Sequence, residues 1–174
     1  MADLPDQFDV AIVGAGPAGL SAATELRRLG AGKVLVLERD AEPGGVPRHC
    51  GHSPYGMREF RRPMFGPAYA RSLSTAARQA GVQIATGVTV MSVHTGPVLT
   101  VSSDKGTAEI RASLVMLATG IRETTRAGRL LGGTKPGGIL TTGGLQGLVY
   151  EAGMRPFQRP VILGTELVAF SAIL

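Results

Sequence analysis

The chain has 174 residues, a length that suits one ordinary domain and leaves little room for a second. It carries 18 Lys plus Arg against 13 Asp plus Glu, a net charge of +5, and 44% of its residues are apolar. That apolar content is enough for a core and excludes disordered and collagen-like chains. The single Cys excludes a disulfide framework, an intrachain redox pair and an all-Cys metal site.

The sequence contains neither a membrane span nor a nucleic-acid recognition motif. Its first ten residues carry acids instead of the basic start of a signal peptide, and the most apolar stretch, 161–174, is too short to cross a bilayer. The arginines are scattered and aromatic residues make up only 5%, so the positive charge suits phosphates on a small ligand better than nucleic acid. We expect a cytoplasmic chain that reaches a membrane, if at all, as a peripheral component through partner subunits.

The first forty residues predict a strand, a helix and a second strand. Residues 8–13 are a short apolar run rich in β-branched side chains, which is typical of a buried strand. Apolar residues recur at helical spacing over 17–29, Gly30 follows as a stop, and 33–38 is a second buried strand. This order predicts a βαβ unit with parallel strands and a right-handed crossover.

The rest of the chain predicts further helices and strands around two Gly-rich loops, 39–66 and 121–144. Loops of this length inside a compact domain are usually functional or disordered. Further helices are expected over 67–80 and 145–152, and further strands over 82–85, 88–94, 98–103, 107–110, 114–119 and 161–163. Turn signals at 95–97 and 104–106 indicate that 88–110 forms an antiparallel three-stranded meander. The predicted fold class is therefore α/β, a Rossmann-like parallel sheet with an attached meander.

Residues 14–19 match the pattern G-x-G-x-x-G, which alone is weak in a chain with 25 Gly. Here it follows a predicted strand and opens a predicted helix, which is the context of a dinucleotide-binding turn. Gly14 permits the tight turn, Gly16 lets a pyrophosphate approach the backbone, and Gly19 lets the helix pack closely on the strand. Pro17 and Ala18 begin the helix, whose free N–H groups and partial positive charge attract phosphate.

Glu38 ends the next strand about twenty residues after this turn, as the motif requires. Its carboxylate is expected to accept hydrogen bonds from ribose hydroxyls, and its charge argues against the 2′-phosphate of NADP. From these residues alone the dinucleotide can be NAD or FAD. The remaining alternative is an ordinary βαβ turn without a ligand.

Three motifs in order resemble the FAD-binding domain of flavoproteins that have two dinucleotide-binding domains. They are the segment 9–23, then Glu38-Arg39 followed by Gly44-Gly45, and then Ala118-Thr119-Gly120. The resemblance implies FAD as cofactor, a ribose contact at Glu38, a Gly-Gly loop beside the flavin, and close passage of the chain at 118–120.

The segments 44–52 and 141–146 are similar to α-type subunits of hydrogen cyanide synthase, opine oxidase and dye-linked proline or hydroxyproline dehydrogenases. That resemblance implies oxidation of the C–N bond of an amino or imino acid or an opine, with hydride transfer to FAD. It also implies that the electrons leave through partner subunits instead of NAD. The residues then expected to bind the cofactor are Gly14, Gly16, Pro17, Ala18, Gly19, Glu38, Arg39, Gly44, Gly45, Val46, Arg48, His49, Ala118, Thr119 and Gly120.

No catalytic residue is assigned, and no metal is expected. His49, Cys50 and His52 invite a zinc interpretation, but zinc takes three or four protein ligands and the only other His, His94, lies in a predicted strand. They are expected to line the flavin site instead. Cys50, as the single Cys, could still bridge to a cluster or a thiol of a partner.

Five arginines surround the long loop: Arg39, Arg48, Arg58, Arg61 and Arg62. A guanidinium can hold FAD phosphates or a substrate carboxylate in bidentate fashion, and Arg39 and Arg48 lie nearest the matched motifs. The alternative is that these are solvated loop arginines.

The expected domains are 1–155, an incomplete FAD-binding domain with the meander at about 88–110, and 156–174, the start of a second nucleotide-binding-like domain. At 164–169, Glu166 stands where the superfamily pattern has its second glycine, and its bulk and negative charge disfavour NAD(P)H at this position. The alternative, compatible with the first, is that Glu166 caps the start of a helix. The superfamily's FAD domain is completed by a returning strand that these residues lack. We therefore expect a truncated chain, the N-terminal part of a longer subunit.

Three functions remain open from the sequence. The first is an FAD-binding subunit, or a fragment of one, of a dehydrogenase that acts on amino acids and is built from several subunits. The resemblance does not imply that the 174-residue chain is active alone. The second is an NAD(P)H-dependent flavoprotein reductase. The third is a non-catalytic remnant that binds a partner.

Overall fold

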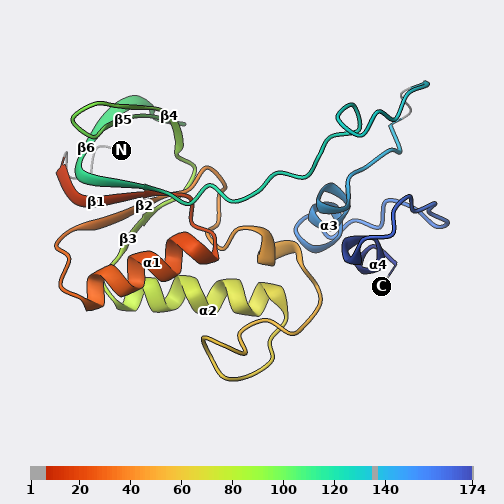
Figure 1. The fold of residues 1–174 in the computed structure, drawn as a ribbon, viewed down its shortest axis with the longest axis horizontal. Coiled ribbons are helices and arrows are strands. Elements are labelled where there is room, and N and C mark those ends of the chain that lie inside the picture. The colour runs from red at the N-terminus through yellow and green to blue at the C-terminus, as the bar shows by residue number, and fades with distance from the viewer. Residues whose placement is uncertain (1–6, 135–136, 174) are drawn as a thin grey trace. The chain divides into compact units, whose positions relative to one another are not determined.

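The structure is a computed structural model that describes residues 7–134 and 137–173. Along the chain its elements are β1 (Gln7–Val13), α1 (Pro17–Arg28), β2 (Val34–Leu37), the 3-10 helix η1 (Val46–His49), α2 (Gly66–Gln79), β3 (Gln83–Ala85), β4 (Thr89–His94), β5 (Val98–Ser103), β6 (Gly106–Leu117), α3 (Thr142–Tyr150) and α4 (Leu167–Ser171) (Figure 1). None of the helices in these two ranges is long and apolar enough to cross a bilayer.

The described chain divides into two compact units. Of the described residues, the first contains 7–45 and 70–120, and the second contains 46–69, 121–134 and 137–173. The first unit holds the sheet and its core, whereas the second holds η1, the long loop after it, α3 and α4. The expected boundary between domains at 155–156 stays a prediction.

One six-stranded sheet in the order β3-β2-β1-β6-β5-β4 forms the first unit. The strands β3, β2, β1 and β6 are parallel, and β6, β5 and β4 are antiparallel neighbours. Val13 is paired with both Leu37 and Leu117, so β1, β2 and β6 end at the same edge of the sheet. The chain moves outward from β1 to β2 and β3 and then returns to the other side of β1 as β6. Ligands of open α/β sheets bind at such a switch point, beyond the carboxyl ends of the strands.

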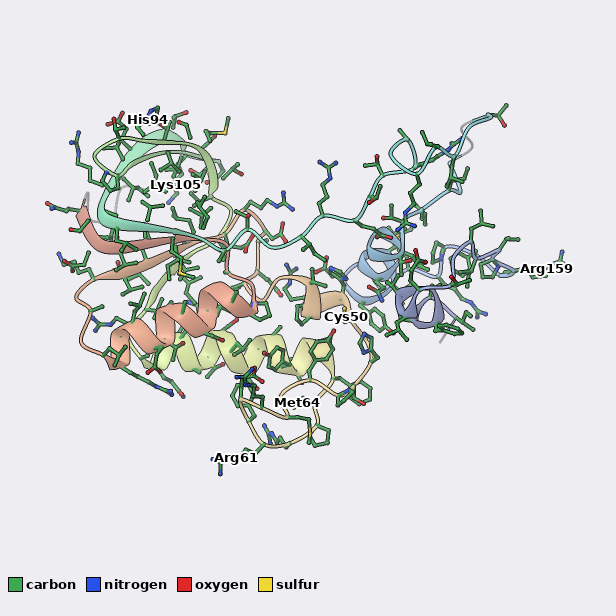
Figure 2. All side chains as sticks on the ribbon, in the orientation of Figure 1. Cys50, Arg61, Met64, His94, Lys105 and Arg159 are labelled. Carbon is green, nitrogen blue, oxygen red and sulfur yellow. The ribbon has the colours of Figure 1, made fainter. Side chains whose placement is uncertain are left out.

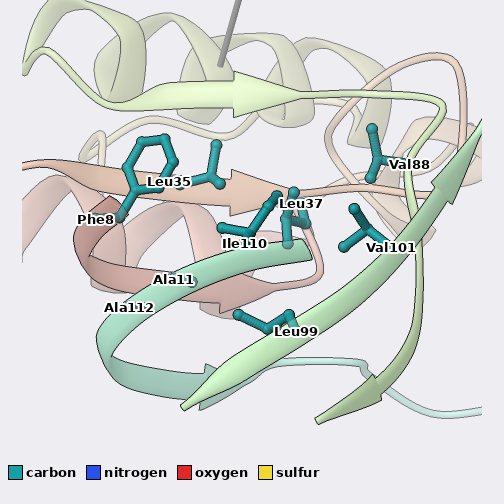
Figure 3. Close-up of a cluster of buried hydrophobic side chains, with 9 residues drawn as sticks. All are labelled: Phe8, Ala11, Leu35, Leu37, Val88, Leu99, Val101, Ile110 and Ala112. Atoms are coloured by element: carbon teal, nitrogen blue, oxygen red, sulfur yellow. The ribbon is translucent and has the colours of Figure 1, made fainter. Parts of the chain in front are cut away.

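One cluster of the core of this unit lies between the parallel strands and the curled meander. Phe8 of β1 and Leu35 and Leu37 of β2 pack with Leu99 and Ile110 of the meander, and all five side chains are buried (Figure 3). Helix α1 packs on β1 and β2. The meander therefore covers part of β1 and β2, the strands that lead into the glycine turn.

The α/β fold class, the βαβ unit and the meander are confirmed, and two details of the last strand differ. The expected strands 107–110 and 114–119 are one continuous strand, β6. Its second half is not buried, since Leu114 is 53% exposed and Leu117 65% exposed. Beyond residue 111, β6 pairs only with β1, so one side of it lacks a described neighbour.

The second unit differs from the sequence prediction at two places. Residues 161–163 form no strand, because they have no pairing partner among the described residues. Helix α3 begins at Thr142, three residues earlier than predicted. The Thr141 side chain accepts a hydrogen bond from the N–H of Gly144, and Glu123 accepts from the N–H groups of Thr142 and Gly143. Capping from these two side chains offsets the weak helix propensity of the two glycines.

Candidate dinucleotide site

The glycine turn joins β1 to α1 at the carboxyl edge of the sheet. The N–H of Gly14 donates to the carbonyl of Leu37 at 2.8 Å, and the N–H of Ala118 donates to the carbonyl of Val13 at 2.8 Å. Gly14 has φ +106°, a conformation that favours glycine, and a Cβ there would overlap the Ala118 carbonyl. A Cβ at Gly19 would overlap the carbonyl of Gly14. The turn is thus closed by backbone on its inner side.

The outer side of the turn is open at Gly16. No atom lies within 4 Å of the position that a Cβ would take there. Gly16 is the N-cap of α1 with no side-chain cap hydrogen bond, and Pro17 is the first helical residue. The N-terminal N–H groups of a helix lack intrahelical partners and attract anions. This combination of open space and free N–H groups fits a pyrophosphate.

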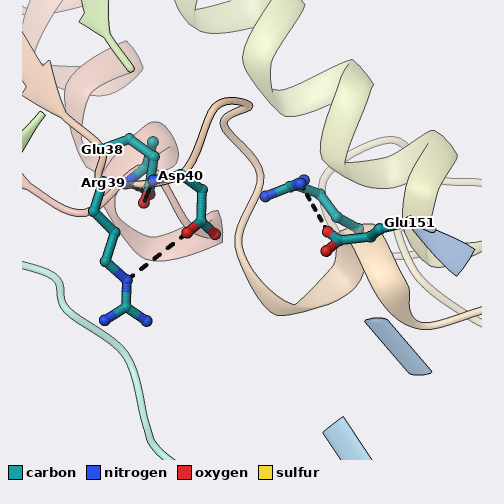
Figure 4. Close-up of polar contacts among 6 residues, drawn as sticks. Glu38, Arg39, Asp40 and Glu151 are labelled. Atoms are coloured by element: carbon teal, nitrogen blue, oxygen red, sulfur yellow. Dashed lines mark hydrogen bonds and ion pairs between the residues drawn. The ribbon is translucent and has the colours of Figure 1, made fainter. Parts of the chain in front are cut away.

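Glu38 lies beside the turn and its side chain is held there. It is 9% exposed. Its Oε2 accepts a hydrogen bond from the N–H of Ala15 at 2.8 Å, and its Oε1 accepts from the N–H of Asp40 at 3.1 Å (Figure 4). Each carboxylate oxygen can accept a second hydrogen bond. The carboxylate is therefore fixed in position and retains acceptor capacity, which fits ribose hydroxyls.

Arg39, the next residue, points away from this network. Its side chain is 80% exposed, and its Nε lies 3.8 Å from Oδ1 of Asp40 (Figure 4). An ion pair this exposed contributes little to stability. A role for Arg39 in binding phosphate stays a prediction.

The Gly-Gly segment lies against the glycine turn. The N–H of Gly44 donates to the carbonyl of Ala15 at 2.8 Å. Gly45 has φ +61°, and a Cβ there would lie 2.8 Å from the Cα of Gly16. The two motifs, about thirty residues apart in the sequence, are therefore in direct contact within the first unit.

The segment 118–120 completes the same edge of the sheet. Ala118 directly follows β6 and touches the turn through Gly14, as described above. Thr119 and Gly120 are exposed, and Gly120 has φ +72° with open space at its Cβ position. The structure thus brings together Gly14–Gly19, Glu38, Gly44, Gly45 and Ala118 within one unit.

The remaining expected residues, Val46, Arg48 and His49, belong to the second unit and lie in η1. Val46 is 49% exposed. Arg48 forms an ion pair with Glu151, with 2.7 Å between its Nη2 and Oε1 of the glutamate. This partner was not predicted from the sequence, and no spacing signal could reveal it, because the two residues are about 100 positions apart.

His49 and Cys50 interact electrostatically within this loop (Figure 2 labels Cys50). The contact with the Cys50 thiol raises the pKa of His49, and the same contact lowers the pKa of Cys50. Cys50 is only 5% exposed. Burial also raises the pKa of nearby Tyr55 above its ordinary value. Nδ1 of His49 is buried and has no hydrogen-bond partner among the described residues.

Three arginines of the loop, Arg58, Arg61 and Arg62, are exposed. The loop is closed by backbone hydrogen bonds between Tyr55 and Met64 at 2.9 and 2.8 Å. Figure 2 shows Arg61 at the outer end of this loop. Within the described chain none of the three arginines forms an ion pair, and no group of three or more His, Cys, Asp or Glu side chains is arranged to hold a metal.

Comparisons with known proteins agree with this geometry. Residues 12–63 match the family model described as an NAD(P)-binding Rossmann-like domain. An opine oxidase subunit of Agrobacterium tumefaciens (strain Ach5) is 33% identical over an alignment 174 positions long, gaps included, that covers 93% of this chain and 33% of that protein. The corresponding opine oxidase subunit of Rhizobium meliloti is 30% identical, covering 93% of this chain and 31% of that protein. The crystal structure of L-proline dehydrogenase from P. horikoshii superimposes with a TM-score of 0.59 and 27% identity, over 68% of this chain and 24% of that chain.

The fold, the glycine turn and these similarities together define a class. The chain has the fold of a Rossmann-like dinucleotide-binding domain, and it is similar to subunits of FAD-dependent oxidoreductases. Within that class it is similar over most of its length to the two opine oxidase subunits, and it spans about a third of the length of those curated relatives.

Proposed function

We propose that this chain is the FAD-binding part of a larger oxidoreductase subunit that oxidises the C–N bond of an amino acid, an imino acid or an opine. The observation that carries the dinucleotide-binding part of the proposal is the turn itself, open at Gly16 and flanked by the fixed carboxylate of Glu38. The similarity to the opine oxidase subunits and to L-proline dehydrogenase supports FAD as the dinucleotide. The printed names of its relatives, an opine oxidase subunit and an L-proline dehydrogenase, support this substrate class. We also propose that electrons leave through partner subunits and that the protein is cytoplasmic.

Each proposed contact follows from a group in the chain. The N-terminal N–H groups of α1 would bind the pyrophosphate, and Gly16 would allow its oxygens to reach the backbone. Glu38 would accept hydrogen bonds from the ribose, and its negative charge would repel a 2′-phosphate. Bound FAD supplies the two-electron acceptor, while the protein supplies binding and orientation.

The segment around Glu166 supports an acceptor other than NAD. Glu166 is the N-cap of the five-residue helix α4. Its carboxylate lies close to the backbone of Gly164, since a Cβ at Gly164 would be 2.6 Å from Oε2 of Glu166. Hydrogen bonding to its own backbone N–H, followed by Arg129, lowers the pKa of Glu166, so that it is negatively charged at neutral pH. A carboxylate in place of a glycine at this position, here paired with Arg129 at 3.4 Å, disfavours a second pyrophosphate.

The test is the visible absorption spectrum of the purified chain after addition of FAD and desalting. The wild type should retain flavin, and Glu38→Ala should bind FAD at least tenfold more weakly, because hydrogen bonds to a charged group contribute about 1.5–3 kcal/mol. Glu38→Gln keeps one acceptor oxygen, and its affinity for FAD should lie between those of the wild type and Glu38→Ala. Glu25→Ala, which removes an exposed carboxylate of α1, is the matched control. Equal retention by Glu38→Ala and the wild type would show that the ribose assignment is wrong.

A further inference from the structure

Residues 55–65 form a compact loop, here called the arginine loop, that is closed at its base by backbone hydrogen bonds. The N–H of Tyr55 donates to the carbonyl of Met64 at 2.9 Å, and the N–H of Met64 donates to the carbonyl of Tyr55 at 2.8 Å. Inside the loop, the N–H of Phe60 donates to the carbonyl of Gly56 at 2.8 Å, which makes a single helical turn. A Cβ at Gly56 would lie 2.8 Å from Sδ of Met64, so the base of the loop is closely packed.

Four aromatic rings connect this loop to the first turn of α2 within the second unit. The ring of Phe60 meets the ring of Tyr69 edge-on, with 6.0 Å between their centroids. Tyr69 also stacks on Tyr55 at 5.5 Å, and the ring of Tyr55 lies 5.3 Å from the ring of His52. Such ring contacts stabilise a structure beyond the burial of the side chains, so the arginine loop has a defined shape.

The charges of the arginine loop are not balanced within the protein. The loop contains three arginines and one glutamate, a net charge of +2. Arg58, Arg61 and Arg62 are exposed, and none of them forms an ion pair with another described residue. Glu59 interacts with Tyr69 instead, since burial and then the adjacent Glu59 raise the pKa of the Tyr69 hydroxyl. The three guanidinium groups are therefore available to a partner.

Arg61 has an unfavourable backbone conformation. Its φ is +54°, in the left-handed region that favours glycine, and only one other non-glycine residue of the described ranges has a positive φ. Figure 2 shows Arg61 at the outer end of the loop, with its side chain directed away from the protein. Residues in such conformations cluster at functional sites. Binding of the guanidinium to a partner would offset the cost of placing an arginine here.

Two large apolar side chains accompany the arginines at the surface. Met57 is 55% exposed and Phe65 is 61% exposed. Arg, Met and Phe are the residue types that are enriched in protein–protein interfaces. A guanidinium pairs with a carboxylate through two parallel hydrogen bonds, which favours acidic side chains as its partners. Anionic lipid surfaces are typically bound by clusters of four to eight basic residues, which is more than this loop contains.

We propose that the arginine loop docks onto an acidic surface of a partner protein. Carboxylates of that surface pair with the three guanidinium groups, and its apolar side chains cover Met57 and Phe65. The docking surface and the rings that support it lie within 52–69 of the second unit, so the proposal does not depend on the binding of FAD.

The probes are two fluorescently labelled acidic polypeptides, polyglutamate and a random copolymer of glutamate and tyrosine. The wild type should bind the copolymer more tightly, because only the copolymer offers apolar groups to Met57 and Phe65. A loop variant with Arg58→Gln, Arg61→Gln and Arg62→Gln should bind both polypeptides about tenfold more weakly or worse. The matched control carries Arg28→Gln, Arg78→Gln and Arg111→Gln, which remove the same charge from exposed arginines of the first unit. Its affinity should fall by less than about threefold.

Two smaller variants separate the parts of the surface. Met57→Ser with Phe65→Ser should abolish the preference for the copolymer and leave the affinity for polyglutamate unchanged. Arg61→Gly should weaken binding of both polypeptides without lowering the Tm, because glycine suits the backbone conformation at this position. The unchanged Tm would show that the loss of binding does not come from unfolding.

Equal weakening in the loop variant and the control variant would overturn the proposal, because binding would then follow net charge alone. Failure of the wild type to bind either polypeptide would also overturn it. Binding of the wild type to vesicles of phosphatidylcholine and phosphatidylserine, but to neither polypeptide, would assign the loop to a lipid surface instead. A dimer in sedimentation equilibrium that the loop variant does not form would assign it to a second copy of the chain, again contrary to the proposal.

Discussion

Two glycines in one turn should respond oppositely to the same substitution. At Gly16 a Cβ would enter open space, whereas at Gly19 it would overlap the backbone carbonyl of Gly14. We therefore expect Gly16→Ala to fold normally and bind FAD poorly, and Gly19→Ala to lose stability.

The expected magnitudes follow from the local geometry. For Gly16→Ala, the loss of a preferred N-cap residue costs about 0.5 kcal/mol, and the less flexible unfolded chain contributes about 0.4–1 kcal/mol in the other direction. The net change in the free energy of unfolding should lie within about 0.5 kcal/mol. For Gly19→Ala, a gain of about 1 kcal/mol in helix propensity is opposed by overpacking, which costs about 1–3 kcal/mol or more. Because the overlapped atom is a carbonyl oxygen in a closed turn, the upper end applies, and we expect a net loss of about 2 kcal/mol.

Thermal unfolding without FAD and quenching of FAD fluorescence separate the two effects. Gly19→Ala should lower the Tm by about 4–8 °C for a chain of this size. Gly16→Ala should keep the Tm and bind FAD at least tenfold more weakly, which corresponds to about 1.4 kcal/mol. A folded Gly16→Ala that binds FAD as the wild type does would refute the assignment of the pyrophosphate to this turn. A fully stable Gly19→Ala would refute the argument from close packing.

Two further predictions concern the core and the loop. Leu99→Ala should lower the free energy of unfolding by about 3 kcal/mol, because Leu99 is fully buried between the meander and β1–β2. The control Leu29→Ala, at a side chain that is 76% exposed, should change that free energy by less than about 0.5 kcal/mol. Equal urea midpoints for the two variants would contradict this view of the core. Cys50→Ala should lower the pKa of His49, because the Cys50 thiol is the largest cause that raises it; an NMR titration of the imidazole C–H signals measures this, and an unchanged or higher pKa would be the contrary result.

The sequence predicted the parts of the fold that are specified by local patterns. The apolar run before Gly14, the helical spacing after it and the turn signals around 98–103 each depend on neighbouring residues, and the corresponding elements are found. The resemblance to a known family assigned both the glycine turn and the Gly-Gly segment to one cofactor, and the structure places these segments in contact through Gly44 and Ala15.

Features that depend on distant contacts could not be predicted. Strand β6 looked like two strands because Arg111 and Ser113 interrupt the apolar pattern, yet Arg111 pairs with both Val98 of β5 and Gln7 of β1. Likewise, two glycines begin α3 because Glu123, about twenty residues earlier, accepts hydrogen bonds from Thr142 and Gly143. Neither partner can be read from the local sequence.

The pairing of β1 with β6 also governs when the glycine turn can be completed during synthesis. The carbonyl of Ala118 closes the inner side of a turn that begins at Gly14, about 100 residues earlier. A ribosome adds about 5–20 residues per second, so Gly14 and Ala118 are synthesised on the order of 5–20 s apart. During that interval β1 and β2 lack both β6 and the meander that covers Phe8 and Leu35. The nascent chain therefore carries an apolar surface that needs protection from aggregation until the last strand of the sheet has been made.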